Sequence, residues 1–535
     1  MKLLSATQTR ALDQATIQEQ GITSVDLMER AAQALLFWLY GRYLYRSPAD
    51  ILVLCGPGNN GGDGLALARL LHEARQPVRV ARLPSARYSA DYEVNLARLP
   101  AAVPQAEIRA DALPAIQPTT LVVDALFGSG LSRPLAGLAA ALVHHLNASG
   151  AAVVAVDVPS GLATDSEPRP AVPDSPADLP AAVVRATHTV SFGQPHLAFL
   201  LPQNAAFVGE WHVEDIGLSR AFIESADTPW HLTGFLQADL NTVDITWPPR
   251  PAPVPELSLP RREKFAYKNT FGHALLLAGS RGKLGAAVLA AGACLRGGVG
   301  LLTVRVPGAG LGVLQISQPE AMGLPDPNPD FISELPDLSP YQAVGLGPGV
   351  GQNPATAAVL RALLTAAALG ADRPRPLPLV LDADALNLLG AHRELLALLP
   401  ENTVLTPHVG EFTRLTEAAR DDYHRLALLR EFAQKHRVIV VLKGAYSAVA
   451  APDGQVYFNP TGNPGMATGG SGDCLTGLLL ALRADQRLPA LTATRLAVLA
   501  HGRAGDLAAA EIGEAGLVAG DIVRFLGPAL RELIK

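Results

Sequence analysis

Short apolar runs alternate with helical stretches along most of the chain. In the first half the spacing predicts an amphipathic helix over 24–40 and another helix over 65–75. Between the helical stretches, the apolar runs have the length of buried strands, and this alternation is typical of a parallel sheet with helices on both faces. The first half is therefore predicted to be a doubly wound, Rossmann-like α/β domain. Its expected strands are the apolar runs at 51–55, 78–81, 121–124 and 153–158, and the last segments of the domain are 187–192 and 209–217.

The same alternation restarts in the second half and predicts a second α/β domain. Asp453-Gly454 lies between two β-prone runs, 447–450 and 455–458, and this pair predicts a hairpin turn. No internal repeat relates the two halves. The apolar runs expected to form the second sheet are 273–278, 301–306, 343–346, 379–382, 404–405 and 438–442.

A proline-dense segment separates the two halves. Residues 247–260 read WPPRPAPVPELSLP, a composition typical of a stiff linker. We therefore expect one domain over 1–220, a Pro-rich linker over 221–260 and a second domain over 261–535. A run rich in Pro and Ala at 165–180 is expected to be a surface insertion in the first domain.

Composition narrows the classes of protein and partner. The chain has 535 residues, 49% hydrophobic and 17% charged, so two well-buried domains are expected. Its net charge of −6 gives no basic surplus for a nucleic acid. No apolar run reaches membrane-spanning length. The cysteines Cys55, Cys294 and Cys474 are isolated, which argues against a disulfide framework and favours a protein of the cytoplasm.

The strongest local motif in the first half follows the run at 51–55. Residues 56–64 read GPGNNGGDG and lead into the helix expected from Leu65. Five glycines in nine residues allow a backbone to approach a ligand and direct amides at an anion. The string lacks the ending of a phosphate-binding P-loop and the spacing of the dinucleotide fingerprint. A merely tight turn, the alternative, would need only one or two glycines.

Two more strand ends carry an acid and a small-residue loop. VVDALFGSG at 122–130 contains Asp124, and VDVPSG at 156–161 contains Asp157. Either acid by itself would more often be a loop or cap residue. Because the carboxyl ends of parallel strands face the ligand crevice of an open sheet, three such loops together predict a binding site there.

GPGNNGGDG, VVDALFG and VDVPSG in this order resemble the epimerases of NAD(P)H hydrates, the amino-terminal half of the bifunctional nicotinamide nucleotide repair enzymes. The resemblance covers about residues 1–220. It implies that Asp157 is the acid or base at the epimerised carbon. It also implies that a K⁺ ion is held by Asn60, Asp124 and Ser160. The residues implied to bind the substrate are Asn59, Asn60, Gly61, Gly62, Asp63, Gly128, Ser129, Gly130, Leu131, Ser132, Arg133, Pro134 and Asp157.

One position departs from that family. In TVSFGQPH at 189–196, His196 stands where these epimerases usually have lysine. A histidine keeps a hydrogen-bond donor without a fixed positive charge. The departure leaves the role of this position open.

The second half carries its own glycine-rich motif. Residues 463–473 read NPGMATGGSGD and lead into the helix expected from Leu475. Amides at a helix N-terminus stabilise charge on a transferring phosphoryl group, and an acid there can deprotonate a hydroxyl. A plain helix start would explain Asp473 but not the glycines before it. Lys443-Gly444 alone would more often be a surface turn, and a single histidine such as His408 is more often structural.

LDADALN at 381–387, TPHVGEF at 406–412 and GMATGGSGD at 465–473 together resemble the ribokinase-like fold, and within it the ADP-dependent NAD(P)H-hydrate dehydratases. The match spans about 255–535. It implies that ADP, bound with Mg²⁺, phosphorylates the C6 hydroxyl of the hydrate, after which phosphate leaves. Asp473 would be the base. The resemblance places the hydrate against Ala287, Gly349, His408 and Asp473, and the nucleotide against Lys443, Gly444, Ala445, Tyr446, Ser447 and Gly472.

The two resemblances together imply a metabolite-repair enzyme that epimerises R- and S-NAD(P)HX and dehydrates the S epimer, acting as a homo-oligomer. Two alternatives remain at this point. The second domain could be a true small-molecule kinase, which would release a stable phosphorylated product. The first domain could be a nucleotide-sensing or partner-binding module without activity, although the intact GPGNNGGDG, Asp124 and Asp157 argue against this.

Overall fold

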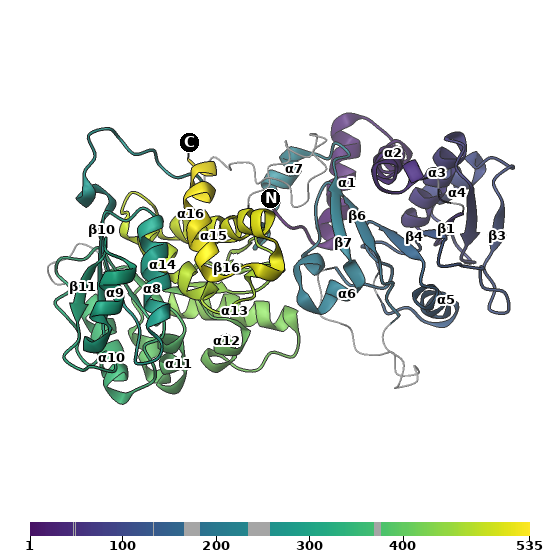
Figure 1. Cartoon of the computed structure of the whole chain (residues 1–535). Helices are drawn as coiled ribbons and strands as arrows, with labels where there is room; N and C mark the ends of the chain where they lie inside the picture. The colour runs from purple at the N-terminus through teal and green to yellow at the C-terminus, as the bar shows by residue number, and fades with distance from the viewer. Residues whose placement is uncertain are drawn as a thin grey trace. The chain divides into compact units, whose positions relative to one another are not determined.

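The computed structural model describes residues 1–46, 48, 50–131, 133–164, 182–233, 257–368 and 376–534. Two compact units divide the chain: Met1–Thr228 makes up most of the first, and the residues from Pro229 onward make up most of the second. Figure 1 colours the first unit from purple through blue and the second from teal through green to yellow. The insertion expected at 165–180 lies outside the described residues, as does most of the proline-dense segment.

A seven-stranded parallel sheet forms the centre of the first unit, in the order β3-β2-β1-β4-β5-β6-β7. The chain starts in the middle and winds outward to each edge, so the predicted doubly wound Rossmann-like fold is confirmed. The strands are β1 (Ile51–Cys55), β2 (Val78–Arg82), β3 (Gln105–Glu107), β4 (Leu121–Ala125), β5 (Ala152–Val156), β6 (His188–Phe192) and β7 (Glu210–Glu214). The helices are α1 (Ala6–Gln20), α2 (Ser24–Arg42), α3 (Asn59–Glu73), α4 (Ala90–Arg98), α5 (Gly137–Ala148), α6 (Ala205–Val208) and α7 (Arg220–Ser225).

The second unit is built on a ten-stranded sheet, in the order β11-β10-β9-β12-β13-β14-β15-β16-β17-β8. The hairpin expected at Asp453-Gly454 is the antiparallel pair β16–β17. The strands are β8 (Trp230–Leu232), β9 (His273–Leu277), β10 (Leu301–Val306), β11 (Met322–Pro325), β12 (Ala343–Leu346), β13 (Leu379–Leu381), β14 (Val404–Leu405), β15 (Ile439–Leu442), β16 (Ala448–Ala450) and β17 (Val456–Phe458). The helices are α8 (Leu284–Arg296), α9 (Leu311–Ser317), α10 (Pro354–Ala368), α11 (Asp384–Ala391), α12 (Val409–Leu415), α13 (Asp422–His436), α14 (Ser471–Ala484), α15 (Ala490–Ile512) and α16 (Ala519–Glu532).

Apolar side chains from both faces of each sheet form the cores. In the first unit α2 packs on α3, and the strands β1 and β4 are buried along their whole length. In the second unit α14 packs against α8 and α15, and Figure 1 shows these three helices grouped together. Such continuous burial is what strands covered by helices on both faces require. It explains why their sequences read as unbroken apolar runs.

Two elements fall inside the range 221–260 that we expected to be a linker. Helix α7, of which only Arg220 precedes this range, lies in the first unit, whereas β8 pairs in parallel with β17 at the edge of the second sheet. The domain limits drawn from the sequence stay a prediction. None of the helices in the described part of the chain combines the length and the hydropathy needed to cross a lipid bilayer.

Candidate active sites

The first candidate site lies at the carboxyl ends of β1, β4 and β5. The three predicted loops follow these three neighbouring strands, which pair in register in the order β1-β4-β5. The carboxyl edge is where an open parallel sheet leaves a crevice for ligands. The structure therefore brings GPGNNGGDG, Asp124 and Asp157 to one edge, as the sequence predicted.

Helix α3 begins earlier than the sequence suggested. We expected it from Leu65, but it starts at Asn59, so most of the glycine motif forms its first turns. A Cβ atom on Gly61 would lie 1.8 Å from the carbonyl oxygen of Gly56, and one on Gly64 would lie 2.6 Å from Cβ of Ala125. These glycines therefore permit close packing of the helix on its strand and are not a flexible loop.

Asp124 and Ser160 form a buried hydrogen-bonded pair. The Ser160 hydroxyl donates to Asp124 Oδ1 at 2.6 Å, and the Ser160 amide donates to Oδ2 at 2.8 Å. The Leu126 amide also donates to Oδ1, at 3.2 Å. Burial nevertheless raises the pKa of Asp124 to about 6, because these neutral donors compensate only in part for lost hydration. Asp124 is a buried carboxylate that a cation would stabilise.

The donors near Asp124 suit the K⁺ ion that the resemblance implies. A carboxylate, a hydroxyl and an amide offer the oxygen ligands that hard cations take. Asn60 is only 8% exposed, and its Oδ1 lies against the Gly128 loop, where the Phe127 amide donates to the Ser160 hydroxyl. The oxygens of these three residues therefore fit a hard cation such as K⁺.

Asp157 stands directly after β5 in a strained conformation. Its φ of 64° is in the left-handed region, which costs a residue other than glycine about 1–3 kcal/mol. Because of this turn, the strand ends at Val156 and does not reach residue 158, which we had expected it to reach. His196 Nε2 lies 3.0 Å from Oδ1, and the Ser129 amide donates to Oδ2 at 3.1 Å. Burial alone would raise the pKa of Asp157, but His196 and Ser129 outweigh it and hold the pKa below its ordinary value. The carboxylate is therefore ionised at neutral pH.

The loop predicted to bind the substrate runs past this carboxylate. A Cβ atom on Gly128 would lie 3.1 Å from Asp157 Oδ2 and 3.4 Å from Asn60 Oδ1, so a larger residue would crowd both side chains. On the other side, Arg10 Nη2 of α1 lies 3.5 Å from the carbonyl oxygen of Gly130. Leu131, Arg133 and Pro134 continue the loop, and Ser132 lies outside the described residues.

Two more acids are electrostatically coupled to Asp157. Burial first, and then the Asp157 charge, raises the pKa of Asp13 on α1 to about 7. The pKa of Asp63 on α3 is also raised, by burial and by the charges of Asp157, Asp13 and Asp91. The ionised carboxylate of Asp157 is thus coupled to two acids, Asp13 and Asp63, that favour their neutral form. Such a difference in pKa assigns one group as the proton acceptor and the others as proton donors. Asp63 was predicted as a site residue, whereas Asp13 and Arg10 were not. Arg10 and Asp13 are three residues apart in one helix and so lie on the same face, which was the signal available in the sequence.

The second candidate site is centred on the first turn of α14. We expected this helix from Leu475, but it begins at Ser471, directly after Gly470 with a φ of 93°. Gly472 and Asp473 are therefore in the first turn, where amide groups lack helical partners. Burial, followed by the charge of Asp382, raises the pKa of Asp473 to about 6, although Lys443 opposes the shift.

A buried ion pair lies next to the first turn of α14. Lys443 Nζ donates to Asp382 Oδ1 at 2.9 Å, and the Thr476 hydroxyl donates to Oδ2 at 2.7 Å. A Cβ atom on Gly472 would lie 3.3 Å from Lys443 Nζ, which places the ammonium beside the glycine turn. Burial lowers the pKa of Lys443, but Asp382 and Glu411 outweigh it and raise the pKa overall. Asp382 belongs to the LDADALN motif, but the sequence analysis did not predict it as a site residue.

The loop after β15 and the start of α12 complete this region. His408 caps α12, its Nδ1 accepting from the amide of Gly410 at 3.0 Å, and Nε2 is 3.4 Å from Glu411 Oε1. Glu411 Oε2 is in turn 3.9 Å from Lys443 Nζ. In the predicted nucleotide-binding loop of Gly444, Ala445, Tyr446 and Ser447, the Ser447 hydroxyl bonds the carbonyl of Gly444 at 3.1 Å.

Gly349 and Ala287 occupy different environments. Gly349 has a φ of 64°, and a Cβ there would lie 2.8 Å from the carbonyl oxygen of Lys283. Lys283 Nζ pairs with Asp384 at 3.2 Å, and the charge of Asp384 acts on Asp473, so Gly349 borders the site. Ala287 is 1% exposed within α8, so its side chain faces the core. Its predicted contact with the hydrate stays a prediction.

Two family models match the chain, one in each half. The model described as YjeF-related protein N-terminus matches residues 24–198, and the model described as NAD(P)H-hydrate dehydratase matches residues 274–526. A bifunctional NAD(P)H-hydrate repair enzyme from Moorella thermoacetica is 35% identical, over 100% of this chain and 97% of its own length. This chain belongs to the family of bifunctional NAD(P)H-hydrate repair enzymes.

Other members of the repair-enzyme family match at similar levels. The relative from Thermofilum pendens is 35% identical, over 100% of this chain and 97% of its own, and that from Escherichia coli is 31% identical, over 95% and 89%. Among solved structures, an ADP/ATP-dependent NAD(P)H-hydrate dehydratase from Bacillus subtilis, co-crystallized with ATP/Mg²⁺, is 29% identical. It covers 52% of this chain and 95% of that chain, with a TM-score of 0.45.

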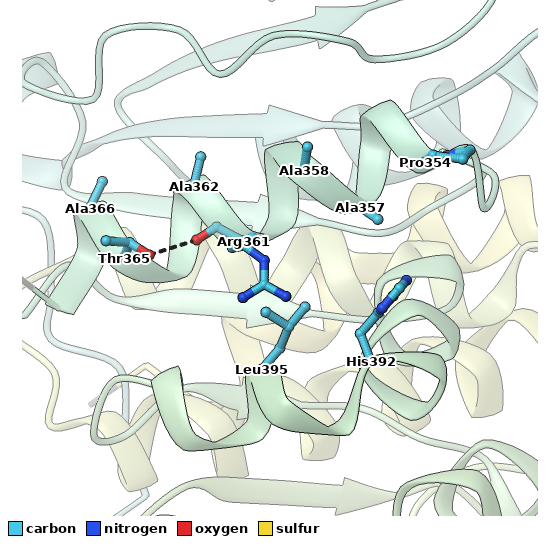
Figure 2. Close-up of a pocket in the computed structure, with 9 residues that line it drawn as sticks. All are labelled: Pro354, Ala357, Ala358, Arg361, Ala362, Thr365, Ala366, His392 and Leu395. Atoms are coloured by element: carbon cyan, nitrogen blue, oxygen red, sulfur yellow. Dashed lines mark hydrogen bonds between the residues drawn. The ribbon is translucent and has the colours of Figure 1, made fainter.

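A surface pocket of about 660 Å³ lies between α10 and the short 3₁₀ helix Arg393–Leu398 and shares no lining residue with either candidate site. Figure 2 shows small side chains of α10 along it, with Arg361 and His392 on opposite sides. Nothing in its lining matches a predicted site residue of the repair enzyme. The residues that line it are Pro354, Ala357, Ala358, Arg361, Ala362, Thr365, Ala366, His392 and Leu395.

Proposed function

We propose that this chain repairs hydrated NADH and NADPH in two steps, one in each domain. The first domain interconverts R- and S-NAD(P)HX at C6, and the second dehydrates the S epimer to NAD(P)H while ADP becomes AMP and phosphate. The observation that carries this proposal is the pair of separate aspartates at ligand-binding edges. Asp157 is held ionised by His196, and the pKa of Asp473 is raised to about 6.

Epimerisation requires that a bond at C6 break and re-form. As the C6 hydroxyl loses its proton, its oxygen becomes a carbonyl, the C6–N1 bond opens and N1 keeps the electron pair; N1 then attacks the other face of that carbonyl, whose oxygen takes up a proton. Asp157 is the carboxylate that takes the proton from the C6 hydroxyl, and its strained backbone and two hydrogen bonds fix its direction. Asp13 and Asp63, whose pKa values are raised, are the neutral carboxyls that return a proton. Arg10, beside Gly130, supplies positive charge for the substrate's phosphates.

A K⁺ ion fits the oxygens of Asn60, Asp124 and Ser160, and when bound it would supply positive charge beside the substrate. Asp124 is buried and accepts hydrogen bonds from neutral donors alone among the described residues. The role of these residues is to hold the Gly128 loop next to Asp157. Ser160 contributes directly, because its hydroxyl accepts from the Phe127 amide at 2.8 Å.

Dehydration needs activation of the hydroxyl, because hydroxide is a poor leaving group and phosphate a good one. Asp473 accepts the proton of the C6 hydroxyl while the hydroxyl oxygen attacks the terminal phosphorus of ADP, and AMP leaves. ADP would bind together with Mg²⁺. The C6–O bond then breaks with help from the ring nitrogen's lone pair, phosphate leaves, and loss of a C5 proton forms the double bond. The amides of the Gly472 turn and the ammonium of Lys443 stabilise the phosphoryl charge.

The hydrate contacts Gly349, His408 and Ala287, and the nucleotide contacts the loop 443–447 together with Gly472. ADP is the expected donor in preference to ATP. We further propose that the enzyme works in the cytoplasm as a homo-oligomer. Its three cysteines are buried and free, which suits a reducing compartment.

The direct test is incubation of the purified full chain with mixed-epimer NADHX, ADP and Mg²⁺, followed by NADH absorbance. Complete recovery of NADH is expected, with one AMP and one phosphate formed for each NADH. Absence of NADH with either ADP or ATP would contradict the repair function. A stable phosphorylated product would instead identify the second domain as a small-molecule kinase.

A further inference from the structure

Three side chains with metal-binding atoms converge at the edge of the first sheet that lies opposite the candidate epimerase site. His188 is the first residue of β6, and Glu210 and His212 lie near the start of β7. The register pairs His188 with Glu210 across the two strands, and Glu210 and His212 are two residues apart, so all three lie on one face. Asp157, in contrast, follows the carboxyl end of β5.

The distances within this cluster suit a shared ion better than direct hydrogen bonds. His188 Nε2 is 3.5 Å from Glu210 Oε2, and His212 Nε2 is 3.4 Å from Glu210 Oε1. Strong hydrogen bonds of this type measure about 2.7–2.9 Å. Two ligands of a tetrahedral ion with bonds of about 2.1 Å lie about 3.4 Å apart. All three ligand atoms also lie within 4.8 Å of one another.

Neighbouring groups hold the two imidazoles in place. The Tyr43 hydroxyl lies 2.7 Å from His188 Nδ1, which leaves Nε2 for the cluster. Trp38 of α2 packs against both rings, with centroid distances of 5.3 Å to His188 and 5.0 Å to His212. A hydrogen bond donated by the second ring nitrogen, here His188 Nδ1–H to the Tyr43 oxygen, is the usual way in which proteins orient a metal-binding histidine.

Glu210 supplies one negative charge to the cluster, which favours a cation there. One group competes: Arg42 Nη2 lies 3.1 Å from Glu210 Oε1 and partly neutralises the carboxylate.

We propose that His188, Glu210 and His212 form a third site, separate from both catalytic sites, that binds one Zn²⁺ ion. Two imidazoles and one carboxylate are a common set of three protein ligands for zinc, with water in the fourth position. The site would join the edge strand β7 to β6 beneath α2. Because it lies at the opposite edge from Asp157, its occupancy is expected to raise the thermal stability of the first domain and to leave the rate of epimerisation unchanged.

Zinc binding to the chelator-stripped full chain tests this proposal by isothermal titration calorimetry. The wild type should bind one equivalent, and binding should raise its Tm. His212→Ala and the more conservative Glu210→Gln should each weaken binding by more than about 100-fold, beyond the ~10–100-fold typical of outer-shell changes, whereas Tyr43→Phe should cost about tenfold. Arg42→Gln should tighten binding, because it removes the competing cation.

His392→Ala is the matched control. His392 Nδ1 lies 3.9 Å from Glu394 Oε1. Among the described residues, this pair is not part of a group of three possible metal ligands. Zinc binding should be unchanged in this variant. Substitution by Co²⁺ supplies a second measurement, since tetrahedral Co²⁺ gives visible absorption that Glu210→Gln should abolish. Failure of the wild type to bind zinc, or equal binding by folded Glu210→Gln, would overturn the proposal.

Discussion

The candidate catalytic aspartates of the two domains stand in opposite electrostatic settings. Asp157 has His196 within 3.0 Å, and its pKa lies below the ordinary value. Asp473 has other acids nearby, and Lys443, whose charge lowers its pKa, is itself bonded to Asp382 at 2.9 Å. Its pKa is therefore raised to about 6. The neighbours of each carboxyl, and not its residue type, determine its protonation.

The difference suits the two reactions that we propose. A base that deprotonates an alcohol works best with a pKa near the working pH, which describes Asp473. Asp157 takes a proton from the same hydroxyl as a weaker base, and epimerisation depends in addition on neutral acids, Asp13 and Asp63, that provide the opposite proton transfer. Both sites also carry a strained backbone within two residues of the end of a central strand, at Asp157 with φ 64° and at Ala383 with φ 48°.

The largest effect is expected from Asp473→Asn. Loss of the base should reduce dehydration of S-NADHX by about 10³-fold, within the range of general-base catalysis, and leave R-to-S conversion unchanged. The rate of NADH appearance with ADP and Mg²⁺ measures it. Asp485→Asn, at the other end of α14, is the control and should retain full activity. Wild-type dehydration by Asp473→Asn would exclude Asp473 as the base.

The reciprocal change, Asp157→Asn, should slow R-to-S conversion by about 10²-fold. The effect is smaller because the hydroxyl-bearing carbon next to nitrogen also epimerises spontaneously. Chromatographic separation of the two epimers over time provides the measurement, and dehydration of pure S-NADHX serves as the internal control. Unchanged conversion would remove Asp157 from the catalytic account.

The apolar runs predicted most of this arrangement because strands buried on both faces leave continuous hydrophobic segments. They located β1, β4 and β5, and hence the edge that carries Asp124 and Asp157. The helix starts were wrong because glycine is ordinarily a poor helix former. At Gly61 and Gly64 the close approach of helix and strand requires it, and this contact is a tertiary feature.

Pairings between distant segments could not be predicted from one sequence. Lys443 was expected to serve the nucleotide, and the sequence did not show that its ammonium also binds Asp382, 61 residues away. The coupling of Asp13 to Asp157 likewise depends on how α1 packs in the folded domain. The assignment of substrate and K⁺ to particular residues came from the resemblance and stays a prediction.

The pH dependence of the two half-reactions should separate the aspartates. Because the pKa of Asp473 is about 6, dehydration should fall about tenfold per pH unit below pH 6, as the carboxylate becomes protonated. The pKa of Asp157 is lowered, so protonation of this residue should begin to limit epimerisation only at a pH well below the one at which dehydration falls. Initial rates for each reaction across pH give the comparison. Coincident acid limbs would refute it.

Ser160→Ala should affect the first domain alone. It removes the 2.6 Å hydrogen bond to buried Asp124 and should lower the free energy of unfolding of that domain by about 1–3 kcal/mol. Denaturant unfolding monitored by circular dichroism measures this, with Ser149→Ala as the matched control, since Ser149 is a partly buried serine directly after α5 whose hydroxyl bonds a backbone carbonyl. Equal stability of the two variants would contradict the role given to Ser160.

The smallest effect is expected from His196→Lys. An ammonium can keep an ion pair with Asp157 and hold the pKa of that carboxyl low, so the epimerisation rate should change by less than about tenfold. His196→Leu removes the partner and should reduce the rate further. If Lys and Leu have the same effect, His196 does not act through Asp157.

Mixing the two aspartate variants tests the central claim most directly. With mixed-epimer NADHX, ADP and Mg²⁺, Asp157→Asn should rapidly recover only the S portion as NADH, and Asp473→Asn should recover almost none. The two variants together should restore complete and rapid recovery. Rapid conversion of both epimers by Asp157→Asn alone would contradict the division of labour between the two sites.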